Sequence, residues 1–165
     1  MDTHAPDPYG THQPLLMLAI ANTDGPILEL GSGHYSTPLL HAFAKKRGLL
    51  TIDNNLDWLA QFRSLESKWH VFNQTISWPD TTARLLHEGH RFSVCFVDHA
   101  PSEARGRVIA ALRPIVDVFV CHDSQPCEGD VNGYVILDTF RYRLSDQRDP
   151  LTTIVSDTMD VWDWQ

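Results

Sequence analysis

The 165-residue sequence has no run of about 18 apolar residues, the length that a membrane-spanning helix requires. It also begins without the basic, apolar and small-residue pattern of a secretory signal peptide. Both absences argue against a membrane or secreted protein. We therefore expect a soluble, cytoplasmic protein.

Cysteine is scarce, with three residues at Cys95, Cys121 and Cys127. No C-x-x-C pair is present, so the sequence lacks the usual spacing of a structural zinc site. Two of the three lie in or beside apolar segments. We expect reduced thiols in a cytosolic protein.

Basic residues are also few, because 13 Lys and Arg stand against 21 Asp and Glu, for a formal net charge of -8. A surface that binds nucleic-acid phosphates needs a basic face. The charge balance therefore disfavours nucleic acid as a partner.

The residues that are present suit one domain, since 42% are hydrophobic and can build a single core. Residues 1–13 are rich in proline and histidine and carry almost no aliphatic side chains. We predict that residues 1–13 form a flexible tail, which could act as a lid, and that residues 14–165 form the domain.

Short apolar segments alternate with segments of helical spacing along most of the domain. The final two strand-like segments, 140–146 and 151–157, are separated only by a polar turn, which predicts an antiparallel hairpin. The fold class is α/β, a doubly wound three-layer sandwich whose seven-stranded, mostly parallel sheet ends in that hairpin. The other predicted strands are 27–30, 49–53, 70–73, 92–98 and 116–123, and the predicted helices are 14–22, 38–46, 56–67, 81–87, 102–112 and 134–139.

A glycine turn, Glu29-Leu30-Gly31-Ser32-Gly33, closes the first predicted strand. Glycines there let the backbone turn sharply and approach a ligand. Asp53 stands twenty residues beyond Gly33, at the end of the second strand, where a carboxylate can accept ribose hydroxyls. Ser36 occupies the position of the third glycine of a dinucleotide motif, which indicates a nucleoside cofactor without a pyrophosphate.

These motifs resemble the cofactor loop of class I S-adenosylmethionine-dependent methyltransferases, with Glu29, Gly31, Gly33 and Asp53 as the matching positions. The likeness extends over nearly the whole chain, because that family also ends its sheet with an antiparallel hairpin, which a nicotinamide-binding domain lacks. The resemblance implies S-adenosylmethionine as cofactor. The contacts that it implies are Glu29, Gly31, Ser32, Gly33, Tyr35, Asp53, Asn54, Asn73 and Asp98.

Two strand-end motifs, FVDHAP and VCHDSQ, are similar to those of small-molecule O-methyltransferases of the catechol and caffeoyl types. The resemblance implies a divalent metal such as Mg²⁺ between Asp98 and Asp123, where it would activate and orient a hydroxyl. That family has Asn after the second Asp, and this chain has Ser124, which leaves the site one oxygen short. A site with Mg²⁺ and a site without metal both remain open.

Without a metal, His99 or His122 could act as the general base, and His99 is the first choice because it follows Asp98 directly. The alternative is that such a histidine only caps loop backbone. The predicted catalytic set is therefore Asp98, His99 and His122.

Three further features have two readings each. His34 and Tyr35 lie in the cofactor loop, where they could cover the bound nucleoside or admit substrate. Ser36 and Thr37 could admit ligand but more simply cap the helix that begins at Pro38. Three tryptophans could stack on adenine or belong to the core, and they are Trp58, Trp69 and Trp78.

The resulting hypothesis is methyl transfer to an oxygen or nitrogen of a small-molecule or saccharide-like acceptor. The alternative is a non-catalytic module on the same fold that binds S-adenosylmethionine or a protein partner. The acidic strand end lacks the double proline of amino-type nucleic-acid methyltransferases, which disfavours that class. A homodimer is a further expectation, because a small open site often borrows a lid from a second subunit.

Overall fold

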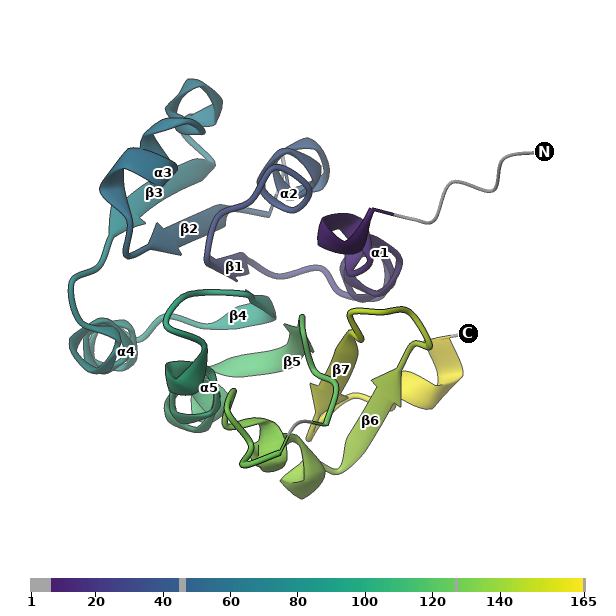
Figure 1. The fold of residues 1–165 in the computed structure, drawn as a ribbon. Helices are drawn as coiled ribbons and strands as arrows, with labels where there is room; N and C mark the ends of the chain where they lie inside the picture. The colour runs from purple at the N-terminus through teal and green to yellow at the C-terminus, as the bar shows by residue number, and fades with distance from the viewer. Residues whose placement is uncertain (1–6, 45–46, 127, 165) are drawn as a thin grey trace.

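The computed structural model describes residues 7–44, 47–126 and 128–164. Seven strands form one sheet in the order β3-β2-β1-β4-β5-β7-β6 (Figure 1). This confirms the predicted α/β fold class. The strands are β1 (Ile27–Leu30), β2 (Leu49–Asp53), β3 (His70–Gln74), β4 (Phe92–Val97), β5 (Val116–Cys121), β6 (Tyr142–Ser145) and β7 (Thr153–Ser156).

The first five strands are parallel, and β7 runs antiparallel to both β5 and β6. Val120 pairs with Ile154, and Leu144 pairs with Ile154 from the other side. The terminal hairpin is therefore confirmed. Because β7 alone is reversed, the carboxyl ends of β1 to β5 meet at the same edge as the turn between β6 and β7.

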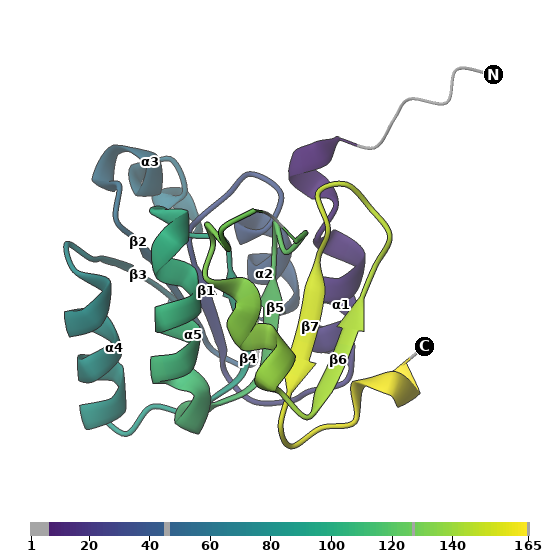
Figure 2. The ribbon, with the colours of Figure 1, turned by 60° about the horizontal axis from the view of Figure 1, so that its bottom comes forward.

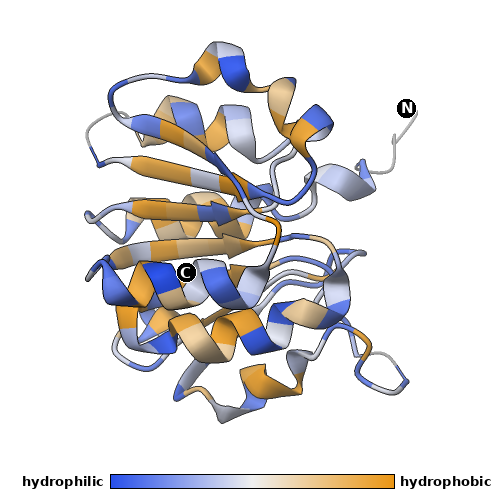
Figure 3. Cartoon of the chain, turned by 90° about the vertical axis from the view of Figure 1, so that its left-hand side faces the viewer, coloured by the Kyte–Doolittle hydropathy of each residue, from blue (hydrophilic) through white to orange (hydrophobic). Residues whose placement is uncertain are grey.

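Helices cover both faces of the sheet, as Figure 2 shows with α4 and α5 in front and α1 and α2 behind. The strands are the most continuously hydrophobic part of the chain (Figure 3), and β4 is buried along its whole length. Strands buried on both faces are typical of parallel sheets between two helical layers. The α-helices are α1 (Gln13–Ala21), α2 (Thr37–Phe43), α3 (Leu56–Ala60), α4 (Trp78–His87) and α5 (Arg105–Leu112).

Several predicted helices differ in extent or type. The helix expected over 81–87 begins earlier, at Trp78, and the helix expected over 102–112 begins with the 3₁₀ turn η3 (Ser102–Ala104). The helix expected over 56–67 ends at Ala60, and a short 3₁₀ turn, η2 (Arg63–Leu65), follows. The chain bends between them so that Phe62 packs with Leu59 and Phe72 in a small separate core. The helix expected over 134–139 is the 3₁₀ helix η5 (Tyr134–Thr139). Its two buried side chains lie three residues apart, which matches the period of a 3₁₀ helix.

Part of the predicted tail is ordered. Residues 1–6 lie outside the described residues, but Pro8–Gly10 form the 3₁₀ helix η1, and Thr11 and His12 are each only 2% exposed. The Thr11 hydroxyl donates to the Pro150 carbonyl at 2.9 Å, which ties the segment to the turn between β6 and β7. We call residues 7–12 the N-terminal strap. It lies at the carboxyl edge of the sheet (Figure 2).

Two other sequence expectations concern composition. Within the described ranges, no helix is long and apolar enough to cross a membrane. Cys95 and Cys121 are buried free thiols, as expected, and Cys127 lies outside the described residues.

Candidate functional site

The glycine turn after β1 presses directly on the end of β4. Gly31 has a φ of 90°, and a Cβ atom at this position would lie 2.6 Å from the Asp98 carbonyl oxygen and 2.7 Å from His99 Cα. Both the backbone conformation and the space exclude other residues. Gly31 therefore sets the close approach between the loop and the strand end that carries Asp98.

The Glu29 side chain is fully buried and stabilises the segment after the glycine turn through hydrogen bonds. Its carboxylate accepts hydrogen bonds from the hydroxyls of Ser36 at 2.7 Å, Thr37 at 2.9 Å and Thr51 at 2.7 Å. Burial of the side chain raises the pKa of Glu29 to about 7. The hydroxyls of Ser36 and Thr37 thus serve Glu29, and neither is the backbone cap of α2 that we expected. Thr37 also accepts the Gly33 amide at 2.9 Å.

Asp53 is the second carboxylate that stabilises the glycine turn through hydrogen bonds. Its Oδ2 accepts the Ser32 amide at 2.7 Å and the Ser32 hydroxyl at 2.8 Å, and its Oδ1 accepts the Asn55 amide at 2.8 Å. Trp58 Nε1 donates to the Ser32 carbonyl at 2.7 Å. Since each carboxylate oxygen has two acceptor positions, Oδ1 keeps one for a ligand hydroxyl. The neighbouring Asn54 is exposed.

A cavity of about 350 Å³ opens beside the glycine turn. It brings together three of the predicted contacts, Gly33, Tyr35 and Asp98, and it adds Trp58 from the set of tryptophans. The cavity also includes His34, which was expected to cover the nucleoside or admit substrate. The remaining lining residues were not predicted as contacts of a cofactor, and they are Tyr9, His12 and Ser36.

The N-terminal strap covers one side of this cavity and contacts both halves of the sheet edge. Gln13, just after the strap, donates to the Tyr35 carbonyl at 2.9 Å, and the Tyr35 hydroxyl donates to Asp7. On the other side, Thr11 Oγ1 lies 3.1 Å from His122 Nε2. The strap therefore links the glycine turn to the end of β5.

His12 is the site residue that sequence reasoning missed. It lines the cavity together with Asp98, yet neither of its ring nitrogens has a hydrogen-bond partner among the described residues. Desolvation, with a smaller effect of His122, lowers the pKa of His12 to about 4, so the ring is neutral at pH 7. Buried polar atoms are rarely left without partners, which makes His12 a candidate ligand contact of this cavity.

The predicted catalytic carboxylate lies in a compact charged cluster at the ends of β4 and β5. Asp98 Oδ2 is 3.2 Å from His122 Nδ1, and Asp123 Oδ1 is 3.8 Å from the same nitrogen. Arg105, from the first turn of α5, reaches Asp98 at 3.0 Å and Asp123 at 3.3 Å. Asp123 has a φ of 53°, a left-handed conformation that turns it back toward the cluster.

His99, the first choice of base, lies elsewhere. Its side chain is buried against the Trp78 ring, with centroids 4.0 Å apart, and it is not among the residues that line the cavity. Desolvation and the nearby Arg105 lower the pKa of His99 to about 4. Both observations weigh against His99 as a base for a ligand in that cavity. Trp78 itself belongs to the main core, and Trp69 packs beside His41.

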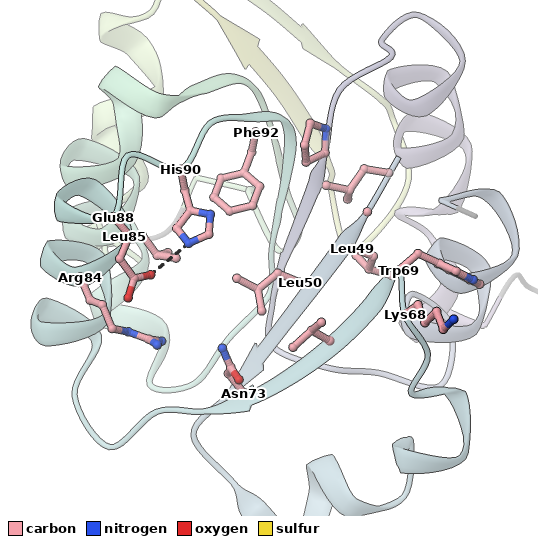
Figure 4. Close-up of a pocket in the computed structure, with 14 residues that line it drawn as sticks. Leu49, Leu50, Lys68, Trp69, Asn73, Arg84, Leu85, Glu88, His90 and Phe92 are labelled. Atoms are coloured by element: carbon pink, nitrogen blue, oxygen red, sulfur yellow. Dashed lines mark hydrogen bonds and ion pairs between the residues drawn. The ribbon is translucent and has the colours of Figure 1, made fainter. Parts of the chain in front are cut away.

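Asn73 is also separate from the cavity. It lines a different, largely apolar groove of about 320 Å³ over β2 and β3, together with Leu50, Leu85 and Phe92 (Figure 4). Ile27, Leu49 and Phe92, which begin their strands, border this groove. It therefore extends toward the amino ends of the strands, away from Asp53 and Asp98, and we assign it no part in the site.

No protein-family model matches the sequence, and no curated protein matches it either. Solved structures do match the fold. An O-methyltransferase from Bacillus cereus, in complex with S-adenosylhomocysteine, is 14% identical with a TM-score of 0.69, covering 93% of this chain and 82% of its own.

Two further matching structures are an O-methyltransferase and an N-methyltransferase. The Streptomyces achromogenes O-methyltransferase of tomaymycin synthesis, in complex with S-adenosylmethionine, is 16% identical, with a TM-score of 0.67 over 90% of this chain and 79% of its own. An N-methyltransferase from Bradyrhizobium japonicum is 13% identical, with a TM-score of 0.60 over 90% of this chain and 94% of its own. At these identities the comparison establishes that the chain has the fold of class I methyltransferases.

Proposed function

We propose that the protein binds S-adenosylmethionine at the glycine turn and transfers its methyl group to an oxygen or nitrogen of a small molecule. The observation that carries the proposal is the contact between Gly31 and the backbone of Asp98 and His99, which leaves no room for a side chain. This contact joins the glycine turn to the end of β4, which carries Asp98, at the edge of a methyltransferase fold where Asp53 ends β2.

The residues at this edge fit the cofactor. Asp53 Oδ1 retains an acceptor position for a ribose hydroxyl, and the Ser32 hydroxyl can rotate away from Oδ2 to free another. Gly33, Tyr35 and Trp58 line the cavity that continues toward Asp98. A negative carboxylate at that point suits the positive sulfonium group of the cofactor.

The acceptor would lie in the same cavity, between Asp98 and His12. A cofactor bound at the glycine turn would supply a methyl group on a positively charged sulfur, and its product would be a neutral thioether. The acceptor's proton would pass to Asp98, whose Oδ2 is hydrogen-bonded to His122 Nδ1. His12 can donate one hydrogen bond and accept another, which favours a hydroxyl or amine.

The alternative is a non-catalytic module that binds S-adenosylmethionine. The size of the cavity favours this alternative, because its volume of about 350 Å³ lies near the lower limit of typical ligand pockets. A module of this kind would bind the cofactor but release no product.

Detection of S-adenosylhomocysteine separates the two functions. The purified protein is incubated with S-adenosylmethionine and pools of phenols, amines and saccharides, and release of the product is followed by mass spectrometry. We expect release with at least one pool, and loss of release in Asp98→Asn with S-adenosylhomocysteine affinity retained, because this ligand lacks the sulfonium charge. Asp57→Asn is the matched control, because Asp57 is an exposed carboxylate on α3. Cofactor binding without release from any pool would favour the non-catalytic module.

A further inference from the structure

A buried guanidinium lies between the two strand-end carboxylates. The Arg105 side chain is 7% exposed, and its Nη2 contacts Asp98 Oδ1 at 3.0 Å while its Nη1 contacts Asp123 Oδ2 at 3.3 Å. Asp98 and Asp123 are more open, at 30% and 36%. The cation thus sits behind the carboxylates, on the side away from solvent.

Backbone carbonyls fix the guanidinium in this position. Arg105 Nε donates to the His99 carbonyl at 2.8 Å, and Nη1 also approaches the His122 carbonyl at 3.4 Å. The Tyr134 hydroxyl donates to that same His122 carbonyl at 3.0 Å. Since these carbonyls follow β4 and β5 directly, Arg105 holds the two strand ends at a set separation.

We propose that Arg105 supplies the positive charge that a divalent metal would bring to Asp98 and Asp123, so that this site works without a bound metal. The assignment makes Arg105 a positioning residue, because it acts on a ligand through the two carboxylates.

The donor atoms that remain do not fit Mg²⁺. The free ligand atoms of Asp98, His122 and Asp123 lie within 4.8 Å of one another, but His122 Nδ1 is already hydrogen-bonded to Asp98 Oδ2. Mg²⁺ requires near-octahedral coordination by oxygen, and imidazole nitrogen is a softer ligand. Water could complete such a site, but Arg105 and His122 already contact both oxygens of Asp98 and Oδ2 of Asp123, and the third donor is a nitrogen.

Ser124, at the position where related metal enzymes have Asn, cannot complete the set. Its hydroxyl is directed toward the hairpin, where it contacts the Leu151 carbonyl at 3.1 Å and Thr153 Oγ1 at 2.7 Å. Ser124 is 4% exposed. The oxygen that the sequence offered as a weak ligand is therefore used inside the fold.

The charge balance leads to the same conclusion. Two carboxylates and one guanidinium leave one net negative charge at the edge of the cavity that Asp98 lines. A dication added there would meet a buried positive charge that shares the same carboxylates, and charges of like sign repel each other. One net negative charge remains available for a singly positive ligand.

Titration with Mn²⁺ tests the proposal directly, because the free ion has a strong paramagnetic resonance signal. The samples are wild type, Arg105→Gln, the double variant Arg105→Gln with Asp98→Asn, and Arg107→Gln as the matched control on the exposed side of α5. We expect no site in wild type or Arg107→Gln up to millimolar Mn²⁺. Arg105→Gln should bind at least about tenfold more tightly than wild type, and the double variant should lose the gain.

Two results would overturn the proposal. The first is a wild-type site whose affinity matches that of Arg105→Gln. The second is a folded Arg105→Gln that binds no Mn²⁺, since the guanidinium would then not stand in a metal's place. If Arg105→Gln does not fold, Arg105→Lys retains the charge and must behave as wild type, and Mn²⁺ binding by it would count against the proposal. The titration contains no cofactor, so its result is independent of whether the protein transfers methyl groups.

Discussion

The two halves of the candidate site differ in how completely their polar atoms are paired. On the side of β1 and β2, Glu29 and Asp53 each accept three hydrogen bonds from neighbouring residues. On the side of the N-terminal strap, neither ring nitrogen of His12 has a hydrogen-bond partner among the described residues. The glycine turn is thus preformed, whereas the acceptor side still has unused hydrogen-bonding groups.

This contrast suggests a division of work. A preformed loop binds its ligand without the cost of ordering itself. Unpaired buried groups cost stability until a ligand satisfies them, so they are retained where binding requires them. We infer that the glycine turn serves the cofactor and that the strap side serves the acceptor.

The largest expected effect comes from breaking the preformed loop with Gly31→Ala. The added Cβ atom would clash with backbone atoms of Asp98 and His99, which cannot move aside as a flexible side chain can. We expect loss of cofactor binding and a loss of stability of about 3 kcal/mol or more, measured by urea unfolding. Gly89→Ala is the control, because Gly89 also has a positive φ but has no atom within 4 Å of an added Cβ among the described residues. Its cost should be about 1 kcal/mol, and equal losses in both variants would contradict this account.

The next largest effect is the pH dependence of stability that Glu29 causes. Its pKa is raised by burial from 4.5 to about 7, so the folded state holds a proton that the unfolded state releases between these values. Its contribution to stability is therefore complete below pH 4.5 and is lost as pH rises to about 7. The loss is on the order of 3 kcal/mol.

Glu29→Gln removes this pH-dependent contribution to the free energy of unfolding. Unfolding of wild type and variant is compared at pH 5 and pH 8, and the difference isolates Glu29 from the buried histidines that titrate in the same range. The variant should gain stability relative to wild type on going to pH 8. Glu103→Gln, an exposed control, should show no such gain. A parallel pH dependence of Glu29→Gln and wild type would show that the carboxylate is ionised throughout.

His12→Phe tests the strap side of the cavity, where buried polar atoms lack partners within the described part of the chain. The substitution removes two unpaired buried nitrogens, so stability should rise by about 1 kcal/mol at pH 7. Because the pKa of His12 is lowered to about 4, wild type also loses stability as pH falls from 6.5 toward 4, and the variant should lose less.

Methyl transfer by His12→Phe should fall while its S-adenosylhomocysteine affinity is kept. His87→Phe, on the exposed side of α4, is the control, and a destabilised His12→Phe with normal turnover would refute the assigned role.

Tyr35→Phe should have the smallest effect. The Tyr35 hydroxyl donates to Asp7 in the strap, and the tyrosine is partly exposed. Its removal loosens one attachment, while the bond from Gln13 to the Tyr35 carbonyl remains. Cofactor affinity measured by calorimetry should change by less than about fivefold. A larger change would mean that this single bond holds the strap closed.

The features predicted from sequence were those with local signals. Buried strands, a glycine turn and the spacing to Asp53 are readable within about 25 residues, and the structure confirms the seven-stranded sheet that they imply. Element ends were less accurate, since Phe62 packs into a small core that no local pattern announced.

The unpredicted features depend on contacts between distant residues. Thr11 and His122 are 111 positions apart, and nothing in the strap sequence indicates that it lies over the end of β5. Likewise, the order of residues placed His99 beside Asp98 but could not show that Trp78 covers its ring. Nothing in the sequence around Arg105 indicates its contact with Asp123, because the loop after β5 that carries Asp123 is distant in the sequence.

The central claim is that the glycine turn binds S-adenosylmethionine, and calorimetric titration with S-adenosylmethionine and S-adenosylhomocysteine tests it most directly. The account predicts binding of both ligands at one site per chain, weakened in Asp53→Asn and unchanged by added Mg²⁺. Failure of the folded wild-type protein to bind either ligand would contradict the claim.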